Sequence, residues 1–136
     1  MKTRRSLAPL LIAALLAVAC AVTKAPQIAP ATARDLNIGF GLTQANSDYT
    51  TFFKDVGDAS RSGTLSAGQV ATLNSVGHKA KLILEDANKT YKTYVQTKDL
   101  TLVDKINGFV IEAEGIIAQL IAQRAAMLAQ NAKGTP

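Results

Sequence analysis

Apolar residues recur at alternating intervals of three and four along three long segments, and this spacing restricts the possible folds more than any other feature. Such spacing places residues on one side of an α-helix, whereas a half-buried strand needs alternation of two. The segments cover about 33–56, 67–95 and 102–131. Their apolar seams are Ile38, Leu42, Ala45, Tyr49, Phe52 and Val56; Val70, Leu73, Gly77, Ala80, Leu84, Ala87, Tyr91 and Tyr94; and Val103, Ile106, Val110, Ala113, Ile117 and Leu120.

Two short breaks separate the three segments. Gly57 and Gly63 bracket the first break, and residues 97–99 form the second, where Asp99 or the nearby Thr101 can cap the third helix. Ser66 and Gln69 have the spacing of a capping box for the second helix. Because both connections are short, neighbouring helices should run antiparallel. The sequence therefore predicts an all-α fold, an antiparallel three-helix bundle with coiled-coil-like seams.

This bundle is expected to occupy residues 33–131, followed by a disordered tail over 132–136. Its third helix is more apolar than a surface helix needs to be. The side opposite the seam carries small or apolar residues: Gly108, Ile111, Gly115, Ala118, Ala122 and Ala125. We expect this helix to pack centrally between the other two, with a self-association face as the alternative interpretation. Glu112 and Glu114 interrupt the apolar run, which argues against a membrane span.

Composition agrees with one small helical domain. Of 136 residues, 48% are hydrophobic and only 5% aromatic, so the core must consist mainly of aliphatic side chains. The net charge is +5, but Lys2, Arg4 and Arg5 precede an apolar run. Without these three of the 15 basic residues, 12 remain against 10 acidic ones. The remaining positive charges are scattered, and this distribution argues against a nucleic-acid partner.

The first twenty residues have the three parts of a secretory signal peptide. Lys2, Arg4 and Arg5 form a positive start, residues 7–18 form an apolar run, and small residues precede Cys20. The apolar run is shorter than the roughly 20 residues that a transmembrane helix needs. Residues 1–19 are therefore predicted to be a signal peptide that directs export.

The residues Leu16-Ala17-Val18-Ala19-Cys20 resemble the lipobox of bacterial lipoproteins. The resemblance implies that a diacylglyceryl group is attached to the thiol of Cys20, that cleavage occurs before this residue, and that its new amino group receives a fatty acyl chain such as palmitate. Two or more chains give stable membrane anchoring. Ala17 departs from the commonest pattern, which has Leu at that position. The residue that follows Cys20 is Ala21 and not Asp. In Gram-negative lipoproteins this resembles the default for sorting to the outer membrane, so the resemblance implies the periplasmic side of that membrane if the host is Gram-negative.

An ordinary secreted protein is the alternative interpretation of this segment. Residues 17–19 or 19–21 both fit the small-x-small pattern that a general signal peptidase cleaves. After the cleavage site, Pro26 and Pro30 disfavour a helix. Residues 20–32 are therefore predicted to be an extended tether that holds the bundle away from the membrane surface.

The first break resembles a twelve-residue EF-hand calcium loop. Oxygen-bearing side chains occupy positions one, three, five and twelve: Asp58, Ser60, Ser62 and Gln69. Calcium favours several carboxylates and a bidentate Glu at position twelve, but Asp58 is the only carboxylate and Arg61 adds an opposing charge. We therefore expect no metal site. The Gly and Ser residues are better explained as turn and cap residues.

The sequence offers little for catalysis. His78 is the only histidine and stands beside Lys79, and Glu112 and Glu114 are two residues apart, so they point in different directions on a helix. We expect no enzyme activity and no cofactor. The predicted function is that of a membrane-anchored envelope lipoprotein, a structural or interaction module for another envelope protein or for itself. The alternative is a small-ligand or metal-binding module that uses residues 58–69 or an interhelical cavity.

Overall fold

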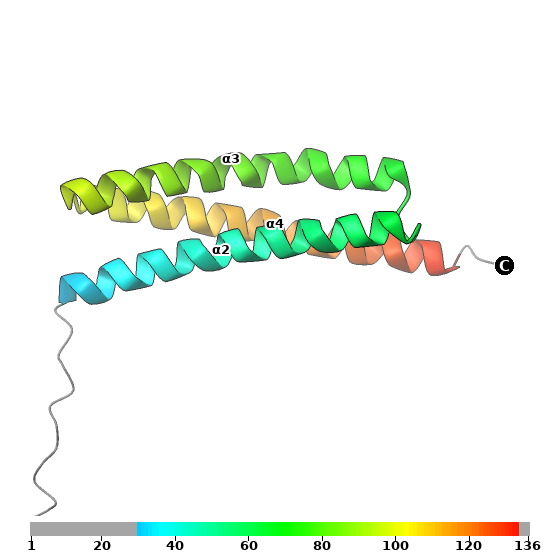
Figure 1. Cartoon of the computed structure of the whole chain (residues 1–136), viewed down its shortest axis with the longest axis horizontal. Helices are drawn as coiled ribbons and strands as arrows, with labels where there is room; N and C mark the ends of the chain where they lie inside the picture. The colour runs from blue at the N-terminus through cyan, green and yellow to red at the C-terminus, as the bar shows by residue number, and fades with distance from the viewer. Residues whose placement is uncertain (1–29, 134–136) are drawn as a thin grey trace, which may run out of the picture. The chain divides into compact units, whose positions relative to one another are not determined.

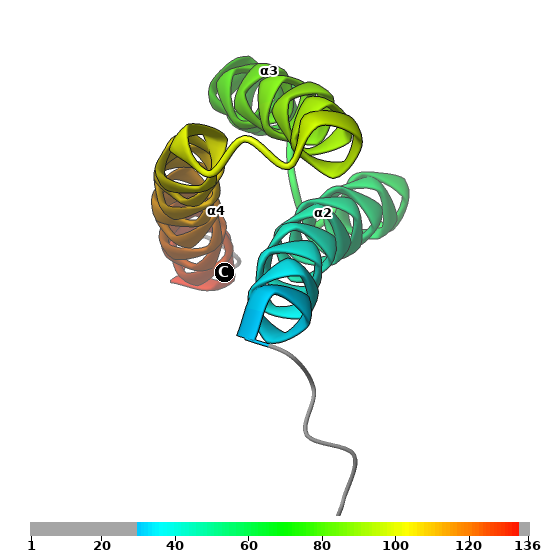
Figure 2. The same ribbon diagram turned by 90° about the vertical axis from the view of Figure 1, so that its left-hand side faces the viewer.

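A computed structural model describes residues 30–133, and it describes side chains from residue 33 onward. These residues form three α-helices: α2 (Pro30–Arg61), α3 (Ala67–Thr97) and α4 (Thr101–Lys133). Successive helices run in opposite directions (Figure 1). Viewed along the bundle, they occupy the three corners of a triangle (Figure 2). The all-α class and the three-helix bundle are confirmed, and the part of the chain described contains no strand.

The helix ends differ from the prediction by a few residues. α2 begins at Pro30, so the predicted tether over 20–32 is wrong for its last three residues. Proline is tolerated in the first helical turn, where its missing N–H would have no helical partner. α2 also continues through Gly57 to Arg61 instead of ending at residue 56. At the other end, α4 includes residues 132–133, which were predicted to belong to the tail.

The connection between α2 and α3, residues 62–66, is fixed by local hydrogen bonds. Gly63 has a φ of 72°, a left-handed conformation that glycine adopts without strain. The Ser66 hydroxyl accepts a hydrogen bond from the Gln69 backbone N–H at 3.3 Å, and the Gln69 side chain accepts one from the Ser66 N–H at 2.9 Å. The predicted capping box is therefore confirmed. Leu65, which is 3% exposed, anchors this connection in the core.

The connection between α3 and α4 is three residues long. Lys98 ends α3 in a left-handed conformation, with a φ of 55°, and its backbone N–H donates to the Tyr94 carbonyl at 2.7 Å. The Asp99 carboxylate then accepts hydrogen bonds from the backbone N–H of Thr101 at 2.9 Å and from its hydroxyl at 2.8 Å. Of the two predicted caps for the third helix, Asp99 is the residue that accepts from the first turn of α4.

All three predicted seams face the centre of the bundle, where every seam residue is buried or half-buried. The buried residues form three successive clusters, each with members from several helices. They are Phe52, Val56, Leu65, Leu73, Ala80, Ile116 and Leu120; then Leu42, Ala45, Leu84, Ala87 and Ala113; then Ile38, Tyr94 and Ile106. All residues of these clusters, with the half-buried side chains packed on them, lie between positions 38 and 128, so the bundle carries its own core.

Small residues set the spacing between α2 and α3. The Phe53 ring of α2 lies against α3 where Gly77 has no side chain, and a Cβ at that position would overlap the ring. Phe53 is held there by neighbouring rings, with centroid distances of 4.8 Å to Tyr49 and 5.1 Å to Phe52. Nearer the start of α2, Gly39 faces Tyr91, whose hydroxyl would lie 2.9 Å from an added Cβ.

The prediction that the third helix packs centrally is wrong. α4 buries one side only, as α2 and α3 do, because each helix of a three-helix bundle faces a single central core. The opposite side of α4, here called the outer seam, is exposed at every position. Its residues are Gly108, Ile111, Gly115, Ala118, Ala122, Ala125, Ala129 and Ala132. Ile111 is 69% exposed, although it is among the larger apolar side chains of the helix.

Candidate functional site

The EF-hand-like residues serve other purposes in the structure. Asp58 and Ser60 lie in the last part of α2, and Asp58 forms an ion pair with Arg61 one turn later. The Ser62 hydroxyl donates to the Ala59 carbonyl at 3.1 Å. Gln69 is used in the capping box described above. Within residues 30–133, no group of three His, Cys, Asp or Glu side chains is placed to hold a metal ion.

The other residues singled out from the sequence lie apart on the surface. His78 is exposed on α3. Its neighbour Lys79 lies 3.9 Å from Glu112 of α4, an exposed ion pair between the two helices. Cys20, the predicted lipidation site, lies outside the described residues, so its modification stays a prediction. None of the helices in the described range is long and apolar enough to cross a membrane.

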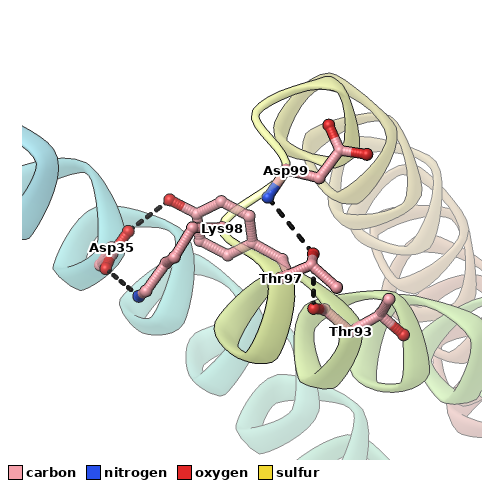
Figure 3. A network of polar contacts seen from close by, with 6 residues as sticks. Asp35, Thr93, Thr97, Lys98 and Asp99 are labelled. Carbon is pink, nitrogen blue, oxygen red and sulfur yellow. Dashed lines mark hydrogen bonds and ion pairs between the residues drawn. The ribbon is translucent and has the colours of Figure 1, made fainter.

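A polar network that the sequence did not reveal joins the start of α2 to the end of α3. Asp35 accepts hydrogen bonds from the Tyr94 hydroxyl and from the Lys98 ammonium, the latter at 2.7 Å (Figure 3). Beside it, the Thr97 hydroxyl donates to the Thr93 carbonyl at 2.9 Å. Asp35 is 59 and 63 positions away from its two partners. The sequence indicated it only indirectly. Short connections predict antiparallel neighbouring helices, and this arrangement brings the start of α2 close to the end of α3.

The hydrogen bonds of this network shift the pKa values of all three of its members. The hydrogen bond from Lys98, followed by that from Tyr94, lowers the pKa of Asp35. The hydrogen bond to Asp35 raises the pKa of Tyr94, and burial raises it further. The same carboxylate raises the pKa of Lys98 by accepting its hydrogen bond. A charged Asp35 with a neutral Tyr94 and a charged Lys98 is therefore the stable combination at neutral pH, and the network acts as a clasp between helix ends.

The clasp should make stability depend on acid pH. The lowered pKa of Asp35 favours folding above its unfolded value of about 3.9, and this contribution is lost as pH falls through the lower folded value. We expect Asp35→Asn to lower the urea midpoint at pH 7 and to approach the wild-type midpoint as the pH is lowered below 4. Asp48→Asn is the control, because Asp48 accepts only a hydrogen bond from Gln44 of its own helix. A constant difference between wild type and Asp35→Asn across this range would contradict the assignment.

An open groove of about 440 Å³ lies between α2 and α4. Apolar side chains line its floor, and acidic and basic groups line its sides. The lining residues are Asp48, Thr51, Phe52, Asp55, Glu114, Ile117, Ala118, Ile121 and Arg124. Ile121 is 51% exposed in this groove, and the groove adjoins the outer seam at Ala118.

Arg124 organises the polar side of the groove. Its guanidinium lies 3.0 Å from the Asp55 carboxylate and over the Phe52 ring, 5.6 Å from the ring centroid. The Arg124 side chain is 25% exposed, so this contact between α4 and α2 is partly shielded from water. The groove contains no arrangement of nucleophile and base that would support catalysis on its own. The groove has an apolar floor and an acidic edge at Asp48 and Glu114.

Comparisons with protein families, with characterised proteins and with solved structures gave no match to this chain.

Proposed function

We propose that this protein is a membrane-anchored lipoprotein of the bacterial cell envelope. In this proposal Cys20 carries the lipid, and the helical bundle acts without catalysis, as a structural or protein-interaction module. In a Gram-negative host, it would be anchored at the periplasmic side of the outer membrane. The observation that carries the proposal is the position of the sole cysteine, directly after the small residues that end the apolar run of the first twenty residues.

The described domain supports the interaction part of this proposal. Several of its charged groups join helices, as in the Asp35 clasp, the pair between Arg124 and Asp55 and the pair between Lys79 and Glu112. By contrast, large apolar side chains remain exposed on its surface, with Phe40 at 72% and Ile111 at 69%. Ile111 belongs to the outer seam of α4, a continuous exposed apolar stripe, and continuous exposed apolar surface is typical of sites that contact another macromolecule.

Ligand binding is the second candidate, and the groove between α2 and α4 is the observation that favours it. Its size falls in the range of small-molecule sites, about 300–1,000 Å³, but it is open along its length, whereas such sites bury most of their ligand. Calcium and a set of apolar ligands can be titrated against the domain while the melting temperature is followed. A saturable rise with an apolar ligand that Ile121→Ala abolishes would favour this second function.

Replacing Cys20 with serine should separate the protein from the membrane. The hydroxyl cannot form the thioether that the lipidation chemistry requires, so Cys20→Ser should lose incorporation of labelled fatty acid and appear in the soluble fraction. Thr23→Ser is the control, since it makes a similarly small change three residues later and should retain the label. If Cys20→Ser stays with membranes after a high-salt wash, or if the wild-type protein takes up no label, the lipoprotein proposal is wrong.

A further inference from the structure

The outer seam of α4 has the geometry of a second helix-packing surface. Its positions alternate by three and four residues from Gly108 to Ala132, the same spacing as the buried seam on the other side of the helix. Ala122 follows the buried Ala113 by nine residues, which at about 100° per residue places the two on opposite sides. Heptad spacing is a feature of helix-to-helix packing. The occupant that this face fits is therefore another long helix.

The glycines of the outer seam have no role inside the bundle. A Cβ added to Gly108 or Gly115 would meet no atom within 4 Å, whereas one added to Gly77 would overlap Phe53. Glycine in the middle of a helix is unfavourable relative to alanine, so these two residues weaken α4 without improving its packing in the chain. Because these glycines have no side chain, the backbone of a second helix can approach α4 closely from outside the bundle.

We propose that this second helix is α4 of another copy of the chain, packed antiparallel. Aligning two outer seams about the point between Ala118 and Ala122 places Ala118 against the partner's Ala122. The same register sets Ile111 against the partner's Ala129, a large residue against a small one. A parallel pair would instead place Ile111 against itself and leave gaps at the glycines. The inference rests on the proposed function in one respect, that the bundle acts by contact.

Charge and area agree with this arrangement. In the antiparallel register Lys133 lies three residues, about one helical turn, from the level of the partner's Asp104, so each end of the interface gains an opposite-charge contact. A parallel pair would place each of these charges against its own copy. From Gly108 to Ala132 the seam spans 25 residues, about 36 Å, and a strip as wide as half the circumference of a helix has an area of roughly 600 Å² per copy. This matches the lower end of specific interfaces, about 1,200 Å² in total.

The oligomeric state of residues 31–136 tests the inference, because this segment contains the whole bundle core. Light scattering over a concentration series should show a mass rising to twice that of the chain. Ala122→Glu places two charges at the centre of the interface and should raise the dissociation constant at least 100-fold. Ala71→Glu is the matched control, an identical change at an exposed position of α3. Ala118→Glu provides a second disruptive variant if Ala122→Glu loses its helical circular dichroism.

Cross-linking in the Cys20→Ser full-length chain tests the orientation. A mixture of Ile111→Cys and Ala129→Cys chains should form disulfide-linked dimers, whereas Ile111→Cys alone should not. A wild-type domain that stays monomeric at millimolar concentration, an unchanged mass for both glutamate variants, or efficient linking of Ile111→Cys to itself would each overturn the inference. These outcomes are independent of acyl labelling at Cys20, so failure of the dimer and failure of the lipoprotein proposal can be told apart.

Discussion

Replacing Leu120 with alanine is expected to lower the free energy of unfolding by about 2–5 kcal/mol, because transfer energy is lost and a cavity is left. Leu120 is 0% exposed and belongs to the largest of the three core clusters, together with Phe52 of α2 and Leu73 of α3. For a domain of about 100 residues, this corresponds to a fall in melting temperature of roughly 10 °C or more. Thermal and urea unfolding of residues 31–136, followed by circular dichroism at one fixed concentration, measure the effect.

Leu82→Ala is the matched control for Leu120→Ala. The side chain of Leu82 is 47% exposed on α3, so the same chemical change removes far less buried surface. We expect the control to lose less than about 1 kcal/mol. Equal losses for the two variants would mean that Leu120 is not in the centre of the core.

Replacing Gly77 with alanine should destabilise the bundle, although alanine is the better helix former. The gain in helix propensity is at most about 1 kcal/mol, whereas forcing extra atoms into a packed site costs about 1–3 kcal/mol. Because the added Cβ would overlap the Phe53 ring, we expect overpacking to dominate, with a net loss of up to about 2 kcal/mol in urea unfolding. The rings of Tyr49 and Phe52 beside Phe53 restrict its ability to move away.

Two further variants separate overpacking from other effects. Gly41→Ala is the control in the middle of α2, where an added Cβ would have its nearest neighbour, Val110, at 4.0 Å; we expect it to be neutral or stabilising. Phe53→Leu in the Gly77→Ala background removes the part of the ring that overlaps. The double variant should lose less stability than the sum of the two single variants. Strict additivity would show that Gly77 and Phe53 do not compete for space.

The sequence was sufficient to predict the bundle because its strongest signal is local. Three-four spacing is a property of each segment taken alone, and the seams it identified are the residues that the structure buries. The capping box at Ser66 and Gln69 was predictable for the same reason, since its two hydrogen bonds join residues three apart. The end of α2 was misplaced because Gly57 was read as a break, although a single glycine is tolerated within a helix at modest cost.

The surroundings of α4 could not be predicted, because spacing identifies a packing face but not what covers it. The outer seam has the same spacing as a buried seam, so periodicity alone predicts a packed position for it. The Asp35 network was missed for a different reason. Its members are separated by about 60 positions, and their meeting depends on the relative register of α2 and α3, which composition and periodicity do not determine.

Because the two connections are short, the bundle is expected to fold fast. Helices that are consecutive in the chain are also neighbours in space, and helical bundles of this kind fold in microseconds to milliseconds. A ribosome adds only about 5–20 residues per second, so the 33 residues of α4 take roughly two to seven seconds to make. Under the proposed export, the N-terminal segment has to be engaged before the end of that interval, because a complete bundle can form in the cytoplasm as soon as α4 has been made.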